Sequence, residues 1–317
     1  MGSNRGHNHG TEAQRRLFVK GWAAATGSER ERAGGFRRDW DGDDARRSFL
    51  AGIALALLAL FLTPAQSRAS ELKQQTLAEW NDYIHSACLR TEERAKASPF
   101  LRISEPPERR ARARAGEIIV WREGDGHAVK VHHGLIHDWA GSVFIPNATI
   151  ADVFAVVRNY DRYPETYKPA VVQAKGRASD VDDDSFSMLF VQKVLFVTAA
   201  VQGEYKVQYT QIDPKHWYSI SQSTRLQAVE GLGQAGMRVL PPDHGPGYVW
   251  RLYSFTRFEE SDGGVYVEVE AIGLSRDVPA LFRWIVDPVV EHLPKDGVHD
   301  TLEKTRNAVL ERVNRQD

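Results

Sequence analysis

The segment that most constrains the fold spans residues 143–175 and reads VFIPNATIADVFAVVRNYDRYPETYKPAVVQAK. Its apolar start is typical of the end of a strand. Thr149 with Asp152 three residues later has the spacing of a helix capping box, and the apolar residues of 150–157 fall on one helical stripe that faces a core. Pro164 ends this helix or separates it from a second turn that carries Tyr167, because the residue before a proline avoids helical dihedral angles. We therefore predict a strand, a capped helix, an aromatic elbow and a new strand.

Strand patterns separated by turns surround this segment, and a terminal helix follows them. A helix is predicted after the last strand, with a kink at Pro288 and a break at residues 294–297. Because strands and helices do not alternate along the chain, the pattern indicates an α+β fold with an antiparallel sheet. The predicted strands are residues 135–145, 171–178, 185–197, 201–209, 217–225, 248–258 and 265–274.

The last predicted hairpin decides which side chains face inward. A two-residue turn at residues 262–263 places Arg257 opposite Glu268. The uncharged face, with Leu252, Ser254, Thr256, Phe258, Val265, Val267, Val269 and Ala271, should face inward. Burying unpaired charges would cost several kcal/mol each, so the opposite face should lie outward or be paired at a rim. It carries Arg251, Arg257, Glu268 and Glu270.

The strand at residues 217–225 has two possible orientations. Ser219, Ser221, Ser223 and Arg225 share one face with Trp217. If this face looks inward, a cavity gains a polar stripe and Arg225 becomes a possible polar anchor for an acidic head group. If it looks outward, Tyr218 and Ile220 line the cavity instead. We favour the outward orientation, because a serine-rich face is easily hydrated.

The composition excludes several kinds of site. The chain has 317 residues, a net charge of −1 and one cysteine, so nothing favours nucleic-acid binding, and neither an intramolecular disulfide nor a cysteine metal cluster can form. Cys88 lies on the apolar stripe of a predicted helix at residues 71–97, where burial is favoured over a nucleophilic role. Arg109, Arg110, Arg112 and Arg114 form a basic cluster that favours a solvated face over contact with acidic lipid.

The first residues are predicted to be separate from the fold. Residues 1–45 are rich in Arg, Gly and Asp and are predicted to be a disordered extension. Arg46 and Arg47 then precede an apolar run of roughly 14 residues, which suits a signal peptide better than a membrane span of about 20. Residues 46–69 therefore resemble a twin-arginine export signal; an ordinary secretion signal and an uncleaved membrane anchor are the alternatives. We expect a periplasmic or extracellular protein.

Two motifs imitate known sites. Residues 231–236 match G-x-G-x-x-G, but Pro241 and Pro242 follow too closely for the helix that a dinucleotide site needs, so a loop over the cavity mouth is favoured. His133 and His137 lie about 13 Å apart on a strand and cannot share one metal ion, and neighbouring His132 and Asp138 do not complete a site. We expect no cofactor and no metal.

The chain resembles the START/polyketide-cyclase-like (SRPBCC) superfamily, nearest to its coenzyme Q-binding START-type branch. The resemblance covers residues 134–313. It is carried by the capped helix at 149–157, the elbow 160–164, residues 167–172, Trp250 and the Phe282-Arg283-Trp284 run. It implies a helix-grip fold, a curved antiparallel sheet wrapped around a long C-terminal helix with a hydrophobic cavity. Many members bind lipids, quinones or other hydrophobic molecules, and some are cyclases or hydrolases.

We expect the chain to have four regions and one main function. After the extension and the signal, residues 70–133 form a helical extension with a short strand, and residues 134–313 form a START-like ligand-binding domain. The expected function is an envelope-located binder or carrier of a hydrophobic small molecule, such as a lipid, a quinone or a polyketide-like molecule, in a monomeric protein. One alternative is a cyclase- or hydrolase-type enzyme that uses Asp161, Arg225 or Glu270.

The other alternative is a membrane-surface module, in which the aromatic start of the terminal helix contacts lipid. The residues expected to line the cavity are Phe190, Tyr209, Trp250, Leu252, Val267, Val269, Phe282, Trp284 and Ile285. Those expected at its rim are Tyr160, Tyr163 and Tyr167.

Overall fold

The structure is a computed structural model that describes residues 72–179, 183–194, 197–245, 249–277 and 283–315, without the side chains of 193–194, 197 and 283–293. The predicted extension at residues 1–45 and the predicted signal at residues 46–69 lie outside the described residues. Within the described part of the chain, no helix is both long and apolar enough to cross a membrane.

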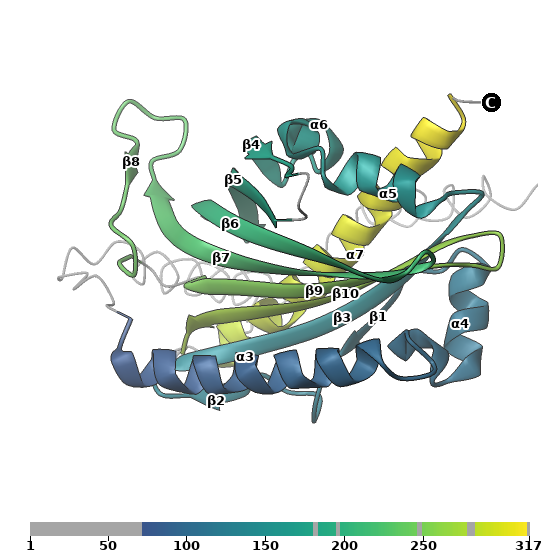
Figure 1. Cartoon of the computed structure of the whole chain (residues 1–317). Coiled ribbons are helices and arrows are strands. Elements are labelled where there is room, and N and C mark those ends of the chain that lie inside the picture. Colours follow the sequence, from purple (N-terminus) through teal and green to yellow (C-terminus); the bar gives the residue numbers. More distant parts are fainter. Residues whose placement is uncertain (1–71, 180–182, 195–196, 246–248, 278–282, 316–317) are drawn as a thin grey trace, which may run out of the picture. The chain divides into compact units, whose positions relative to one another are not determined.

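The described strands form one ten-stranded sheet in the order β1-β3-β10-β9-β7-β6-β5-β4, with β2 added to β3 and β8 added to β7. Neighbouring strands are antiparallel, and the sheet is strongly curved (Figure 1). The strands are β1 Ile119–Arg122, β2 Val129–Val131, β3 Gly134–Pro146, β4 Val171–Arg177, β5 Asp183–Val194, β6 Val197–Asp213, β7 His216–Glu230, β8 Arg238–Val239, β9 Arg251–Ser261 and β10 Gly264–Arg276.

Helices cover both faces of the sheet. The long helix α7 packs on the face that carries Val143 and Val267, which we call the inner face. Helix α3 packs on the face that carries Ile136 and Ile272, which we call the outer face. The helices are α3 Gln74–Ala95, η1 Arg102–Ser104, α4 Pro107–Arg114, α5 Ile150–Val157, η2 Tyr160–Arg162, α6 Tyr163–Thr166 and α7 Arg283–Val313 (Figure 1).

The capped helix and the elbow form as the sequence predicts. The backbone N–H of Asp152 donates to Oγ1 of Thr149 (3.3 Å), and the N–H of Thr149 donates to a carboxylate oxygen of Asp152 (3.1 Å). This capping box starts α5, which buries Ile150 and Val153. The short helices η2 and α6 form the elbow and lead into β4.

Helix α7 differs from the prediction, because it runs without a break through residues 294–297. A proline in a helix interior costs about 3 kcal/mol. Burial of Val298 and Leu302 against β3 offsets that cost, since a fully buried side chain of this kind contributes about 1.5–3 kcal/mol. The contact is close: a Cβ on Gly141 would lie 2.8 Å from Val298 and 2.9 Å from Leu302.

The β9–β10 hairpin has the predicted register. Asp262 and Gly263 form its turn with positive φ angles of 57° and 80°, and Arg257 lies opposite Glu268. Phe258, Val265 and Val267 point to the inner face and share a buried cluster with α7, so the predicted inward orientation of the uncharged face is confirmed.

Candidate binding face

Two apolar clusters occupy opposite parts of the inner face. The larger joins β3, β9 and β10 to α5 and α7, and its fully buried members include Val143, Val265 and Leu302. The smaller joins β5, β6 and β7. It consists of buried Val201, Tyr205 and Leu226, with half-buried Phe186, Met188, Phe190, Val249 and Leu252 packed against them.

A strip of side chains that are neither fully buried nor fully exposed lies on the inner face of β7, β9 and β10, and we call it the half-exposed strip. Its residues are Trp217, Ser221, Ser223, Leu252, Ser254, Thr256, Val269 and Ala271. Hydroxyl side chains meet across its middle, because Ser219 pairs with Thr256 and Ser221 pairs with Ser254. We call Ser219, Ser221, Ser223, Ser254 and Thr256 the hydroxyl band. The strip combines accessible apolar carbon with hydrogen-bonding groups.

The orientation that we favoured for residues 217–225 is wrong, because the serine face looks inward. Tyr218 and Ile220 point to the outer face instead, where they pack against clusters formed with the segment before β3. That segment gives these two apolar side chains a burial site that the sequence of the strand alone does not reveal.

The prediction of Arg225 as a polar anchor is also wrong. A β-bulge shifts the pairing from Tyr205–Ser223 to Glu204–Arg225 and leaves Thr224 as the extra residue. The bulge reverses the alternation of side chains, so Arg225 leaves the serine face. It lies 3.7 Å from Glu204, with side chains 48% and 53% exposed.

Tyr205 places a buried hydroxyl in the smaller cluster. Its ring stacks on Phe186, with centroids 4.7 Å apart and planes 10° apart. A Cβ on Gly203 would lie 2.6 Å from the Tyr205 hydroxyl, so a glycine is needed for this position of the ring. The hydroxyl has no hydrogen-bond partner among the described residues, and burial raises its pKa.

The predicted lining residues divide between several places. Val267 and Tyr209 lie in the larger inner cluster, with Val269 packed against it, and Phe190 and Leu252 lie in the smaller one. Trp250 belongs instead to the outer cluster with Trp80 and Leu274, so its predicted inward position is wrong. Trp250 precedes β9, where strict alternation has not begun. Phe282 and the side chains of Trp284 and Ile285 lie outside the described residues.

The three tyrosines predicted at the rim form a packed corner next to the smaller cluster. Tyr160 donates to Asp184 (2.7 Å), Tyr163 donates to the carbonyl of Val157 (2.6 Å), and Tyr167 hydrogen-bonds to Thr305 (3.0 Å). Their rings contact one another, and burial raises the pKa of each hydroxyl. The elbow is thereby fixed to β5 and α7.

The charged face looks outward as predicted, but its charges form a buried ionic cluster and are neither exposed nor placed at a rim. Arg257 lies 3.6 Å from Glu268 and 3.9 Å from Glu270, and these side chains are almost fully buried. Glu268 accepts the backbone N–H groups of Arg102 (3.1 Å) and Ile103 (2.9 Å). Residues before β1 therefore cover these charges and partly neutralise them.

Asp138 extends this cluster beneath α3. Tyr83 donates to its carboxylate (2.8 Å), and Arg90 lies 3.9 Å from it. Burial and the nearby charge of Glu270 raise the pKa of Asp138 to about 7. Both carboxylate oxygens of Glu270 lack a hydrogen-bond donor among the described residues, although Arg90 lies 3.6 Å away.

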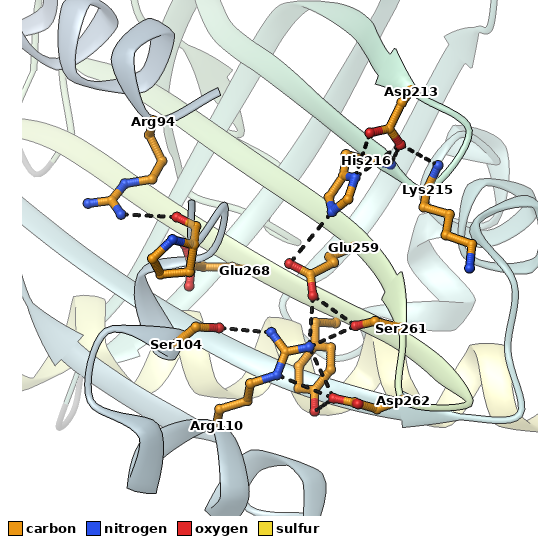
Figure 2. A network of polar contacts seen from close by, with 12 residues as sticks. Arg94, Ser104, Arg110, Asp213, Lys215, His216, Glu259, Ser261, Asp262 and Glu268 are labelled. Carbon is orange, nitrogen blue, oxygen red and sulfur yellow. Dashed lines mark hydrogen bonds and ion pairs between the residues drawn. The ribbon is translucent and has the colours of Figure 1, made fainter. Parts of the chain in front are cut away.

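A second polar network lies at the edge of the outer face (Figure 2). His216 contacts Asp213 (2.8 Å) and Glu259 (3.9 Å), and Glu259 accepts from Arg110 (2.7 Å). Arg110 also pairs with Asp262 (3.0 Å) beside a surface hollow of about 530 Å³. These carboxylates, and the pairing of Arg112 with Glu117, give two arginines of the basic cluster structural partners.

Among the described residues, neither the glycine-rich motif nor the histidine motif brings together the groups that its ligand would need. No helix follows the glycine-rich loop at 231–236, which leads instead to β8. His137 is buried on β3, and its Nε2 lies 3.0 Å from the Ser275 hydroxyl. Within the described ranges, no group of three or more His, Cys, Asp or Glu side chains is placed to hold a metal ion.

A curved antiparallel sheet closed by a long C-terminal helix defines an α+β helix-grip architecture. This chain has the helix-grip fold. No protein-family model matches the sequence, and no curated protein matches it either. Structural neighbours include STAR-related lipid-transfer proteins and di-domain ARO/CYC proteins, and they do not single out the coenzyme Q-binding branch.

Three neighbours illustrate how distant the similarity is. TTHA0849 from Thermus thermophilus is 12% identical, over 55% of this chain and 97% of that one, with a TM-score of 0.39. A STAR-related lipid transfer protein from Xanthomonas axonopodis is 14% identical, over 59% and 97%, at 0.36. The di-domain ARO/CYC StfQ from the steffimycin biosynthetic pathway is 11% identical, over 56% and 52%, at 0.39. Sequence identities and TM-scores this low carry no information about activity.

Proposed function

We propose that this protein binds an apolar small molecule against the inner face of its helix-grip fold. The observation that carries the proposal is the half-exposed strip, where Leu252, Val269 and Ala271 remain accessible on the side that α7 covers. Burial of such carbon stabilises a complex by about 25 cal/mol per Å², less the cost of ordering the ligand. A lipid, a quinone or a polyketide-like molecule would supply the complementary surface.

The side chains of the half-exposed strip favour one chemical class of ligand. In residues 251–259 of β9 and 265–275 of β10 the charged side chains point to the outer face, as Arg257, Glu268 and Glu270 show. The inner side chains of the same segments are aliphatic, aromatic or hydroxylated. This separation favours a ligand that is mostly hydrocarbon.

Native mass spectrometry of the purified full chain after exposure to a lipid extract tests the proposal. We expect a retained small molecule. At about one hundred times Kd it should stabilise the protein by about 2.7 kcal/mol, which raises Tm by several degrees. The variant Leu252→Glu should lose both signals, whereas Val172→Glu, at a position 43% exposed on β4, should keep them. Absence of a retained molecule and of any Tm shift in the unmodified protein would reject the proposal.

The enzyme alternative gains no support from the positions of its predicted residues. Asp161 accepts the backbone N–H of Gly176 (2.9 Å), Arg225 pairs with Glu204, and Glu270 lies beneath the segment before β1. These three groups do not converge on the half-exposed strip. We therefore place binding ahead of a cyclase or hydrolase reaction.

We also propose that the chain is exported, on the strength of residues 46–69. Replacing Arg46 and Arg47 by lysine should trap the protein in the cytoplasm if the signal is of the twin-arginine type. Cell fractionation with immunodetection measures this, and unchanged export would favour an ordinary secretion signal. Contact with a membrane surface and a monomeric state stay predictions of the sequence.

A further inference from the structure

The hydroxyl groups of the inner face have few partners in the protein. Tyr205 is 5% exposed, and its hydroxyl has no hydrogen-bond partner among the described residues. Among the described residues, the hydroxyl groups of Ser221, Ser254 and Thr256 make no hydrogen bond, whereas the Ser223 hydroxyl accepts the backbone N–H of Leu252 (2.9 Å). A buried hydroxyl without a partner is unfavourable, so the Tyr205 hydroxyl is suited to bind a group that the protein itself does not supply.

Tyr205 lies beside the band on the sheet, and its side chain leans along β6 over Gly203, so its hydroxyl lies on the side away from Ser221 and Ser254. Tyr205 pairs with Ser223 across β6 and β7, and Ser221 pairs with Ser254 across β7 and β9. Half-buried Phe190 and Leu252 border the Tyr205 cluster, and Val269 lies on the far side of the band. One elongated molecule could therefore place hydrocarbon on both sides of a polar atom.

The described strand side chains that border the band on β6, β7, β9 and β10 carry no charge. The nearest acid on β5, Asp184, already accepts hydrogen bonds from Arg158 (2.8 Å) and Tyr160 (2.7 Å). Hydroxyl groups both donate and accept, so they suit an uncharged oxygen. A carboxylate or phosphate would need a cation to offset its desolvation.

We propose that the ligand of the inner face is an apolar molecule with an uncharged hydroxyl, carbonyl or ester oxygen, which hydrogen-bonds to the Tyr205 hydroxyl, while the hydroxyl band lies along the rest of the same molecule. This inference rests on the proposed binding function and adds the chemistry of the group that is recognised. Tyr205 thereby becomes a residue that determines specificity. The hydrocarbon part of the ligand contributes affinity, and the hydroxyls select for oxygen.

Three probes of equal chain length test this inference with the full chain at pH 7: dodecan-1-ol, dodecane and dodecanoate. We expect the alcohol to bind about three- to tenfold more tightly than the alkane, and the carboxylate to bind most weakly. Affinities can be measured by displacement of a fluorescent apolar probe. Equal binding of alcohol and alkane, or preference for the carboxylate, would overturn the inference while the binding function stands. Failure of all three to bind would remove both.

Tyr205→Phe separates a recognition role from a structural one. The variant loses the hydroxyl but keeps the ring stacked on Phe186, so the alcohol should bind about three- to tenfold more weakly and the alkane as before. The ligand-free variant should also have a Tm no lower than that of the unmodified protein, because an unpaired buried hydroxyl is removed. Tyr218→Phe, on the outer face of β7, is the matched control and should change neither affinity. Equal losses for alcohol and alkane in Tyr205→Phe would contradict the assignment.

Discussion

The inner and outer faces of β9 and β10 differ in both chemistry and exposure. The outer face carries Arg257, Glu268 and Glu270, and all three are buried beneath residues 72–133. The inner face carries Leu252, Val269 and the hydroxyl band, and much of it stays half-exposed under α7. In an ordinary two-layer fold the exposure would be the reverse. The difference indicates that the extra segment stabilises the sheet from outside, which leaves part of the inner face free for a ligand.

Removing the central outer charge should have the largest effect on stability. Arg257→Ala leaves Glu268 and Glu270 with a weaker counter-charge in a buried site, and we expect a loss of about 3–5 kcal/mol in the free energy of unfolding. Urea denaturation measures it. Arg225→Ala is the control, because its exposed pair with Glu204 should contribute less than about 1 kcal/mol. Similar losses in both variants would mean that burial does not distinguish the two arginines.

A pair of glycines tests how closely the inner face is packed at two points. In Gly141→Ala the new Cβ would lie 2.8 Å from Val298, so helix α7 must shift and we expect a loss of about 1–3 kcal/mol. In Gly273→Ala the closest described contact is Leu252 at 3.5 Å, an ordinary separation. That substitution should be neutral or stabilising by up to about 1 kcal/mol. Equal losses on denaturation would show that the inner face is tightly packed at both points.

The buried acid on the outer face should make stability depend on pH. The pKa of Asp138 is raised from 3.8 to about 7, so between these values the folded protein binds more protons than the unfolded chain. Stability from this group therefore decreases as pH rises from about 4 to about 7, by about 1 kcal/mol per pH unit. Asp138→Asn should remove that slope relative to the unmodified protein. Parallel curves of unfolding free energy against pH would show that Asp138 is ionised normally.

The sequence predicted the parts of this comparison that depend on local rules. The capping box of Thr149, the turn at 262–263 and the alternation in β9 and β10 required only spacing and residue type. The burial of Arg257 could not be predicted in this way, because it depends on residues that lie more than one hundred positions earlier in the chain and pack over it. The prediction for Arg225 failed because the bulge at Thr224 has no clear signal in the local sequence. The break predicted in α7 did not form, because Val298 and Leu302 pack against β3 and the sequence pattern does not show this contact.

The smallest effects should come from a matched pair of threonines on opposite sides of β9. Thr91, on α3, accepts a hydrogen bond from Arg257 (3.1 Å) in a buried site, so Thr91→Val should cost about 1–2 kcal/mol. Thr256, in the hydroxyl band, is half-exposed and its hydroxyl makes no hydrogen bond to a described residue, so Thr256→Val should change stability by less than about 0.5 kcal/mol. The same chemical change thus removes a structural hydrogen bond on the outer face and leaves stability almost unchanged on the inner face. A stability loss at Thr256 as large as that at Thr91 would mean that the hydroxyl band holds the sheet together and is not available to a ligand.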